Sequence, residues 1–205
     1  MAITNGYASL DDARRQAGVL STADTADDAR LEAIVTAVSR HIDNWTGRRF
    51  YQSTADETRY FTAECDERVD VGDLISVTSL RTDYNGDRVY ESTWATSDYE
   101  LEPVNARYMP QPEPYSHIYA APQANYSFPS GLRRGVQVTG RWGYSTAVPE
   151  VVREACLIQV GRLFRRRDSP FGVAGTIDQG TVRLQSRLDP DVQAMLSPLR
   201  RITIA

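Results

Sequence analysis

The sequence contains no lysine, so all 23 of its basic residues are arginines. A phosphate-binding P-loop is therefore excluded, because it needs a lysine that reaches the phosphates. Cysteine and histidine are scarce, with two of each. Two cysteines cannot form a disulfide framework and are typical of a reducing compartment. The apolar runs fall short of the roughly 20 residues of a membrane span, and we expect no signal peptide at the N-terminus.

Spacings typical of catalytic or metal centres are also missing. The chain has no CxxC, HxxxH, HExxH or GxSxG pattern, and the glycines of "GVAG" at 172–175 lack the preceding strand of a dinucleotide fingerprint. His41 falls on a helical pattern, where we expect a partly buried structural residue. His117 has no second candidate ligand near it in the sequence. We therefore expect no enzyme activity, no cofactor and no metal site.

Helical patterns occupy both ends of the chain. Ser9 and Gly18 are suited to begin and end a first helix. A second helix is predicted up to Gly47, with Thr25 and Asp28 as a capping box. Its apolar side chains follow helical spacing on one face and are predicted to be buried: Leu31, Ile34, Val35, Val38, Ile42 and Trp45.

Two further helices are predicted in the C-terminal part. One runs from Pro149 to about Arg167 and has a wide apolar surface, so we expect it to be central. The other begins at Asp189 as N-cap with Pro190 at the first helical position. Its buried stripe is predicted to comprise Val192, Met195, Leu196 and Leu199.

Between these helices the periodicity changes to that of strands. "VDVGDLISVTSL" and "GVQVTGRW" alternate or run in short apolar stretches. Asn85-Gly86 predicts a tight hairpin turn, in which both residues take positive φ. The segment from Pro103 to Pro129 holds six of the ten prolines, and we expect a long ordered loop, arm or edge rather than a regular central strand.

The predicted fold is thus α+β, a small bundle of about four helices with a β-rich insertion between helices 2 and 3. Residues 1–49 and 146–205 form the helical bundle, and residues 50–145 form the insertion.

Charge is unevenly distributed along the chain, whose net charge is −4. Residues 50–145 hold 14 acidic and 8 basic side chains, whereas residues 146–205 hold 6 acidic and 9 basic ones. Four arginines, Arg162, Arg165, Arg166 and Arg167, gather at the end of the third predicted helix. Three interpretations remain open: compensation of the helix dipole, contact with another protein subunit, or contact with nucleic acid.

The connection after this cluster, residues 168–187, is rich in glycine and poor in large apolar residues. We expect it to be mobile in the isolated subunit and to become ordered on assembly. The alternation in "TVRLQSRL" would allow it to add a strand to a neighbour.

Several segments resemble one protein family along nearly the whole chain. The most specific are "HIDNWTGRRF", "VTGRWGYSTAVPEVVREA" and "RRRDSPFG", and "YASLDDARRQAGV", "DLISVTSLRTDYNGDRVY" and "LDPDVQAMLSPLRR" occur in the matching order. In these the chain resembles the head-to-tail connector (adaptor) proteins of long-tailed DNA bacteriophages and of gene transfer agents. The shortest members of that family lack much of residues 50–145.

The resemblance implies a non-enzymatic ring subunit, one of about twelve, in the neck of a virion. Its partners would be the portal protein on one side and a tail-side neck or stopper protein on the other. DNA would pass through the channel without specific binding, and the acidic balance suits such a conduit. Before assembly the subunit would reside in the host cytoplasm.

The C-terminal segment is the part of this family that reaches toward the portal. Carried over, this role falls on residues 188–205, with the free end at Leu199, Arg200, Arg201, Ile202, Thr203, Ile204 and Ala205. A frayed terminus is the competing interpretation. We assign Arg162, Arg165, Arg166 and Arg167 to contacts between subunits. The alternatives are a tail-completion protein of another type, and a nucleic-acid-binding protein that acts through Arg162–Arg167.

Overall fold

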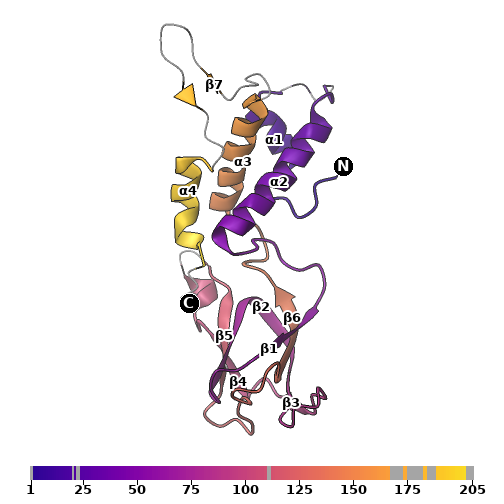
Figure 1. Cartoon of the computed structure of the whole chain (residues 1–205), viewed down its shortest axis with the longest axis vertical. Helices are drawn as coiled ribbons and strands as arrows, with labels where there is room; N and C mark the ends of the chain where they lie inside the picture. The colour runs from indigo at the N-terminus through magenta and orange to yellow at the C-terminus, as the bar shows by residue number, and fades with distance from the viewer. Residues whose placement is uncertain are drawn as a thin grey trace. The chain divides into compact units, whose positions relative to one another are not determined.

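A computed structural model describes residues 2–19, 21, 24–109, 112–166, 173–174, 182–183 and 188–201. The chain forms two compact units, Met1–Arg48 with Val148–Ala205, and Arg49–Ala147. The first unit is helical and the second contains a six-stranded antiparallel sheet (Figure 1). The α+β fold with the sheet inserted between the second and third helices is as the sequence predicts.

The first two helices begin and end largely where local signals place them. α1 spans Leu10–Ala17, and the Ser9 hydroxyl accepts a hydrogen bond from the Asp12 N–H at 3.1 Å. α2 spans Asp28–Thr46. Gly18 and Gly47 follow these helices with φ of 86° and 70°, a conformation that glycine adopts without strain. These stop signals are confirmed.

The capping box predicted at the start of α2 is wrong. Asp27, not Thr25, is the N-cap residue, and its side chain makes no capping hydrogen bond. The Asp28 carboxylate instead pairs with Arg14 of α1 at 2.6 Å. Its predicted capping role is replaced by a contact between the two helices, because Arg14 lies within reach only in the folded chain.

α3, Glu150–Arg165, is the central helix of this unit, as predicted. It contacts α1, α2 and α4, and in Figure 1 it lies between α2 and α4. Its buried residues are Val152, Ala155, Cys156, Leu157, Gln159, Val160, Gly161 and Phe164. Side chains on several sides of α3 are buried because α1, α2 and α4 all pack against it.

α4, Pro190–Leu196, begins as the sequence predicts. The Asp189 carboxylate accepts a hydrogen bond from the Asp191 N–H at 3.0 Å, and Pro190 occupies the first helical position. A short 3₁₀ turn, η3 (Ser197–Leu199), continues the chain. Val192, Leu196 and Leu199 are buried, so most of the predicted stripe is confirmed.

Some side chains on the predicted apolar faces are only half-buried. Trp45 and Met195 are of this kind, and His41 is exposed rather than partly buried. These residues lie at the margins of their helical faces, where the spacing alone does not tell buried from half-covered positions. None of the helices in the described part of the chain is long and apolar enough to cross a membrane.

The sheet has the strand order β1-β6-β2-β5-β4, and β3 pairs with β2 beside this path. The strands are β1 (Glu57–Phe61), β2 (Arg68–Thr82), β3 (Ser92–Trp94), β4 (Tyr99–Glu102), β5 (Tyr115–Ala120) and β6 (Val136–Trp142). The long strand β2 pairs with β5 along its first half and with β6 and β3 along its second half. It therefore holds the sheet together.

One apolar cluster fills the sheet unit. It comprises Ala63, Val69, Val71, Leu74, Leu80, Trp94, Ile118, Phe128, Val136, Val138 and Trp142. Gly140 of β6 allows β2 to approach closely, because a Cβ atom there would lie 2.0 Å from the Ser76 carbonyl oxygen. Side chains of alternate residues on β6 are buried, as expected for a strand that covers a core on one face.

The hairpin signal at Asn85-Gly86 predicts the right neighbours but the wrong turn. β2 and β3 form the antiparallel pair, yet nine residues connect them, and Gly86 and Arg88 have positive φ whereas Asn85 does not. The buried Asp83 carboxylate organises this loop, since it accepts hydrogen bonds from the N–H groups of Asn85, Gly86 and Arg88. A side chain, rather than a two-residue turn, sets the geometry.

The proline-rich segment contains an inner strand, which contradicts the expectation of a loop or edge. β5 lies between β2 and β4 in the sheet. The prolines flank β5 at positions 103–114 and 122–129, and none lies inside it. All six of its residues can therefore donate to the ladder.

Most of residues 168–187 lie outside the described part of the chain. The predicted mobility of this connection concerns those residues and stays a prediction. Two short strands within this range, β7 (Val173–Ala174) and β8 (Val182–Arg183), pair with each other.

Candidate interaction sites

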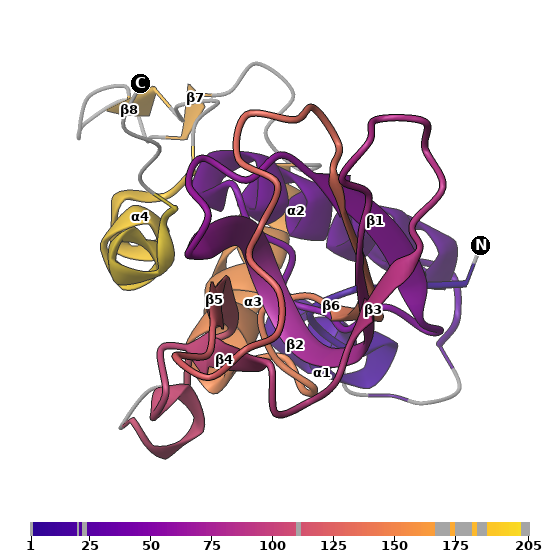
Figure 2. The same ribbon diagram turned by 90° about the horizontal axis from the view of Figure 1, so that it is seen from below.

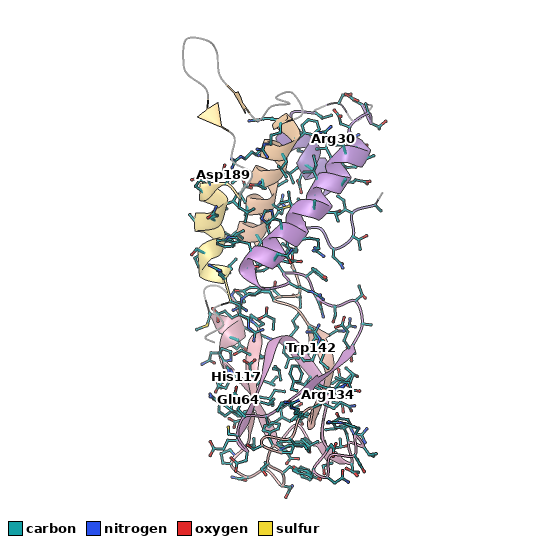
Figure 3. All side chains as sticks on the ribbon, in the orientation of Figure 1. Arg30, Glu64, His117, Arg134, Trp142 and Asp189 are labelled. Atoms are coloured by element: carbon teal, nitrogen blue, oxygen red, sulfur yellow. The ribbon has the colours of Figure 1, made fainter. Side chains whose placement is uncertain are left out.

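The arginine cluster begins with a residue that has a partner within its own chain. The Arg162 Nη1 lies 2.8 Å from the Asp189 Oδ2, and both side chains are mostly buried. The Asp189 N–H donates to the Gln159 side chain at 3.1 Å. Arg162 therefore joins the end of α3 to the start of α4, whose first residues are seen in Figure 3 beside the labelled Asp189.

The remaining arginines of the cluster are placed differently. Arg165 is exposed and Arg166 is half-buried just beyond the helix, while Arg167 lies outside the described residues. Cations at a helix C-terminus are favoured by the helix dipole. Arg162 pairs with Asp189 inside the bundle, whereas Arg165 points to solvent, so these two arginines do not form one exposed patch.

The last described residues pack on the end of α2. Leu199 is buried, with 3% of its surface exposed. The Arg201 N–H donates to the Thr46 carbonyl at 2.8 Å, and the Arg200 guanidinium lies over the Trp45 ring, 5.5 Å from its centroid. The chain therefore makes contacts within its own fold up to Arg201. The sequence predicts a free end that begins at Leu199, and this prediction is wrong for residues 199–201. Residues 202–205 lie outside the described part.

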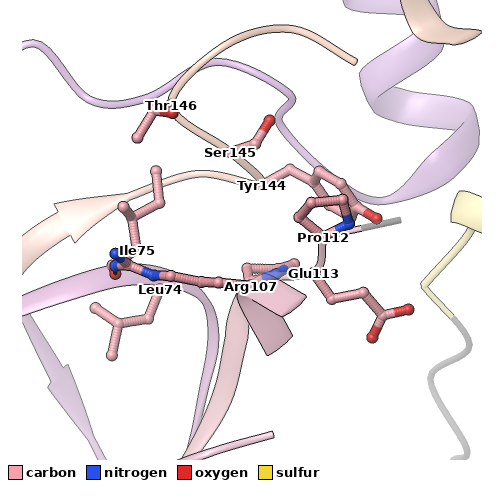
Figure 4. Close-up of a pocket in the computed structure, with 9 residues that line it drawn as sticks. Leu74, Ile75, Arg107, Pro112, Glu113, Tyr144, Ser145 and Thr146 are labelled. Atoms are coloured by element: carbon pink, nitrogen blue, oxygen red, sulfur yellow. Dashed lines mark hydrogen bonds between the residues drawn. The ribbon is translucent and has the colours of Figure 1, made fainter. Parts of the chain in front are cut away.

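The sheet unit carries a hollow of about 140 Å³. It is lined by Leu74, Ile75, Arg107, Pro112, Glu113, Pro114, Tyr144, Ser145 and Thr146 (Figure 4). The one arginine in this lining already has partners within the chain. The Arg107 Nη2 donates to the Ile75 carbonyl at 2.8 Å, and the guanidinium lies over the Tyr115 ring. These lining residues include no histidine or cysteine, so the hollow offers a substrate no nucleophile with a neighbouring imidazole base.

The buried thiol of Cys156 is not a reactive group. Burial raises its pKa to about 11, although a hydrogen bond with Ser39, 3.8 Å away, acts in the opposite direction. The thiolate is the nucleophilic form of cysteine, so the residue acts here as a small core side chain. Among the described residues, no group of three or more histidine, cysteine or carboxylate side chains could hold a metal ion.

No family model matches the chain, and no curated protein matches its sequence. Its fold is similar to that of two chains from one kind of particle. The first belongs to the neck of an empty gene transfer agent (GTA) particle computed with C6 symmetry, with a TM-score of 0.60 at 17% identity. The second belongs to the virion of a native gene transfer agent particle, with a TM-score of 0.60 at 16% identity.

Both likenesses cover 100% of this chain and 95% of the other. They therefore include the helical unit and the sheet unit together. At this identity the likeness establishes a common fold.

Sequence reasoning missed two features of these surfaces. It did not pair Arg162 with Asp189, although a C-terminal arginine and an N-cap aspartate on consecutive helices are a usable signal. It also gave no role to Val104, Tyr108 and Met109, which are exposed on the sheet unit. Their signal was three large apolar residues within a short proline-bounded segment.

Proposed function

We propose that this protein is a structural subunit of the neck of a phage-like particle or gene transfer agent. It forms a ring that connects the portal to the tail and extends the DNA channel. The observation that carries this proposal is the full-length likeness to a chain from a gene transfer agent neck, which extends over both units. The segments of sequence that resemble connector proteins support the same function independently.

The proposed ring contains twelve copies. The neck of the similar particle was computed with C6 symmetry, and twelve copies are compatible with a sixfold axis. Copies in such a ring contact each other through two unlike surfaces, because a head-to-tail contact closes by rotation. We assign Arg165, Arg166 and Arg167 to subunit contacts, with Arg162 fixing the end of α3 from within.

The proposed portal contact is the C-terminal end from Arg200 to Ala205. Arg200 and Arg201 are exposed next to the end of α2, and Ile202 and Ile204 are β-prone residues that can pair with a strand or enter a groove. Leu199 serves this contact indirectly, since its burial fixes where the segment leaves the bundle.

The experiment is negative-stain microscopy and native mass spectrometry of the pure protein, alone and with the portal protein. We expect rings of twelve on the portal. Removal of residues 202–205 should leave the fold intact and abolish portal capture, whereas removal of residues 199–205 also deletes the buried Leu199 and tests stability as well. Undiminished capture by the chain ending at Arg201 would reject the portal contact.

Charge reversal tests the subunit contact separately. Arg165→Glu with Arg166→Glu should weaken ring formation more than portal affinity. The alternative function, nucleic-acid binding through Arg162–Arg167, predicts instead a loss of duplex DNA binding that depends on salt concentration. If the unmodified protein shifts the mobility of duplex DNA in a gel at physiological salt, that result would favour the nucleic-acid-binding alternative over a connector.

A further inference from the structure

One side of the sheet unit presents an ordered apolar turn. The connection from β4 to β5 contains the 3₁₀ turn η1, Ala106–Tyr108. Val104, Tyr108 and Met109 are 60%, 89% and 46% exposed there. Large apolar side chains that gather on a surface mark sites of protein interaction, and tyrosine and methionine are enriched in such contacts.

The turn is held firmly despite its exposed side chains. Ala106 is completely buried, and its carbonyl accepts a hydrogen bond from the Glu113 N–H at 3.1 Å. The Arg107 side chain reaches back to the Ile75 carbonyl of β2. Tyr108 is therefore presented on an anchored backbone, and docking through it requires little further ordering.

The surroundings of this turn are acidic. Residues 98–114 carry four carboxylates and one arginine. Asp98 is buried, whereas Glu100 and Glu113 are exposed and Glu102 is half-buried, and Glu100 lies on β4 at the edge of the sheet. We name Glu100, Glu102, Val104, Tyr108 and Met109 the turn face.

A second surface combines arginines with exposed apolar side chains. The Arg134 guanidinium lies over the Tyr60 ring of β1 at 4.8 Å, and Arg88 donates to the Arg133 carbonyl. Tyr60 is 41% exposed and Val89 is 56% exposed. We name Tyr60, Arg88, Val89, Arg133 and Arg134 the arginine face.

Carboxylates near the arginine face are largely engaged within the β2–β3 loop. Asp83 is buried and accepts three backbone N–H groups. Asp87 accepts the Val89 N–H and a hydrogen bond from the Asn85 side chain. The three exposed arginines thus remain able to pair with carboxylates of another molecule.

The two faces lie at opposite ends of the strand order, because β4 closes one edge of the sheet and β1 closes the other. Figure 2 shows β4 and β1 on opposite sides of the sheet unit. The faces are unlike, complementary in charge, and each carries exposed apolar side chains. These are the properties of a head-to-tail contact between identical chains.

We propose that the turn face of one copy docks on the arginine face of the next, so that the sheet units form a continuous belt of subunit contacts. This contact deepens the proposed ring and rests on it. Tyr108 and Met109 then cover apolar surface around Tyr60 and Val89, while Glu100 and Glu102 meet Arg133 and Arg134. The occupant of each face is a second copy of this chain.

The test uses two full-length variants, one for each face. Tyr108→Ser with Met109→Ser alters the turn face, and Arg133→Glu with Arg134→Glu alters the arginine face. All four side chains are exposed, so the melting temperature should stay unchanged. Arg30→Glu is the control for charge reversal outside the two faces, since Arg30 is exposed on α2 of the other unit (Figure 3).

Sedimentation velocity over a concentration series measures self-association. We expect the unmodified chain and Arg30→Glu to associate alike, and each face variant to associate at least tenfold more weakly. An equimolar mixture of the two face variants should form dimers and nothing larger, because it retains one intact turn face and one intact arginine face.

Three results of the sedimentation experiment would overturn the contact. They are an unmodified chain that stays monomeric throughout, face variants that associate as the unmodified chain does, and strong association of the arginine-face variant alone, which would mean that like faces meet. If the face variants still form rings on the portal, this contact is rejected while the neck function stands. If the unmodified chain forms no ring there, the proposed function itself fails. If a face variant self-associates normally but loses portal capture, that face binds the portal protein instead. If it self-associates normally but loses DNA binding, that face binds DNA instead.

Discussion

Arg162 and Asp189 join two consecutive helices through one carboxylate that has two tasks. Asp189 Oδ2 pairs with the Arg162 guanidinium at 2.8 Å, and its Oδ1 caps α4. Because Asp189→Ala removes the cap and the pair together, we expect it to lower the free energy of unfolding by about 2 kcal/mol. Arg162→Ala, which removes the pair and leaves the cap in place, should cost about 1 kcal/mol. Urea unfolding measures both.

Arg165→Ala is the control for this prediction, because Arg165 is exposed on the same helix. Its effect should stay within about 0.5 kcal/mol. Equal losses for Arg162→Ala and Arg165→Ala would contradict a specific role for the ion pair.

The second prediction separates two apolar residues of α2. Ile42 is completely buried, whereas Trp45 is half-buried beneath Arg200. Ile42→Ala should therefore cost about 2–5 kcal/mol. Trp45→Ala should cost about 2 kcal/mol, below the range for a fully buried tryptophan. Thermal unfolding of the two variants checks the order, and a larger loss for Trp45→Ala would place the tryptophan in the core.

The third prediction concerns acid stability through Asp83. Burial alone raises the pKa of this carboxyl, but hydrogen bonds from the N–H groups of Gly86, Arg88 and Asn85 outweigh it and hold the pKa below its usual value. The stabilisation is therefore present above the unfolded pKa of about 3.8 and is lost as the pH falls through the folded pKa. Asp83→Asn should destabilise the chain at neutral pH.

Unfolding free energies of the parent and of Asp83→Asn, measured from pH 6 down to pH 2.5, test this coupling. The difference between the two proteins should shrink in acid. A difference that stays constant over this range would assign the effect of the substitution to geometry rather than to charge.

The fourth prediction uses the two thiols. A pKa of about 11 for Cys156 leaves about one thiol in a thousand ionised at pH 8. Cys65 is only partly covered. We expect one fast equivalent of thiol labelling in the native protein and a second only after unfolding. The Cys65→Ser variant should lose the fast equivalent, and rapid labelling of that variant would show that Cys156 is accessible.

Local signals predicted the helices well because the groups that define their ends lie close in the sequence. Ser9 with Asp12, Gly47, and Asp189 with Pro190 each act within one turn. The sheet depends on distant residues instead: the Trp142 Nε1 donates to the Glu57 carbonyl, 85 positions away. No local pattern contains that pairing, so strand order could not be predicted.

The error at β5 has a similar origin. Residues 103–129 are rich in proline as a whole, but the six residues of β5 contain none. The composition of the whole segment therefore does not indicate the strand within it. The candidate sites also depend on residues that are far apart in the sequence, so local patterns do not predict their contacts. Arg162 and Asp189 are 27 positions apart, and the two faces of the sheet unit become opposite only through the strand order.

The two ends of the sheet unit are tied to each other. The Tyr144 N–H donates to the Arg49 carbonyl at 2.8 Å, and the Ser53 N–H donates to the Trp142 carbonyl at 2.8 Å. The polypeptide thus enters and leaves this unit through adjacent backbone, as an inserted module does. Loss of the whole module from a related gene would leave α2 and α3 to be joined across a short gap, and closing a short loop costs little conformational entropy. Because its ends are hydrogen-bonded to each other, we expect residues 49–147 to be a segment that can be added, exchanged or deleted without changes in the helices.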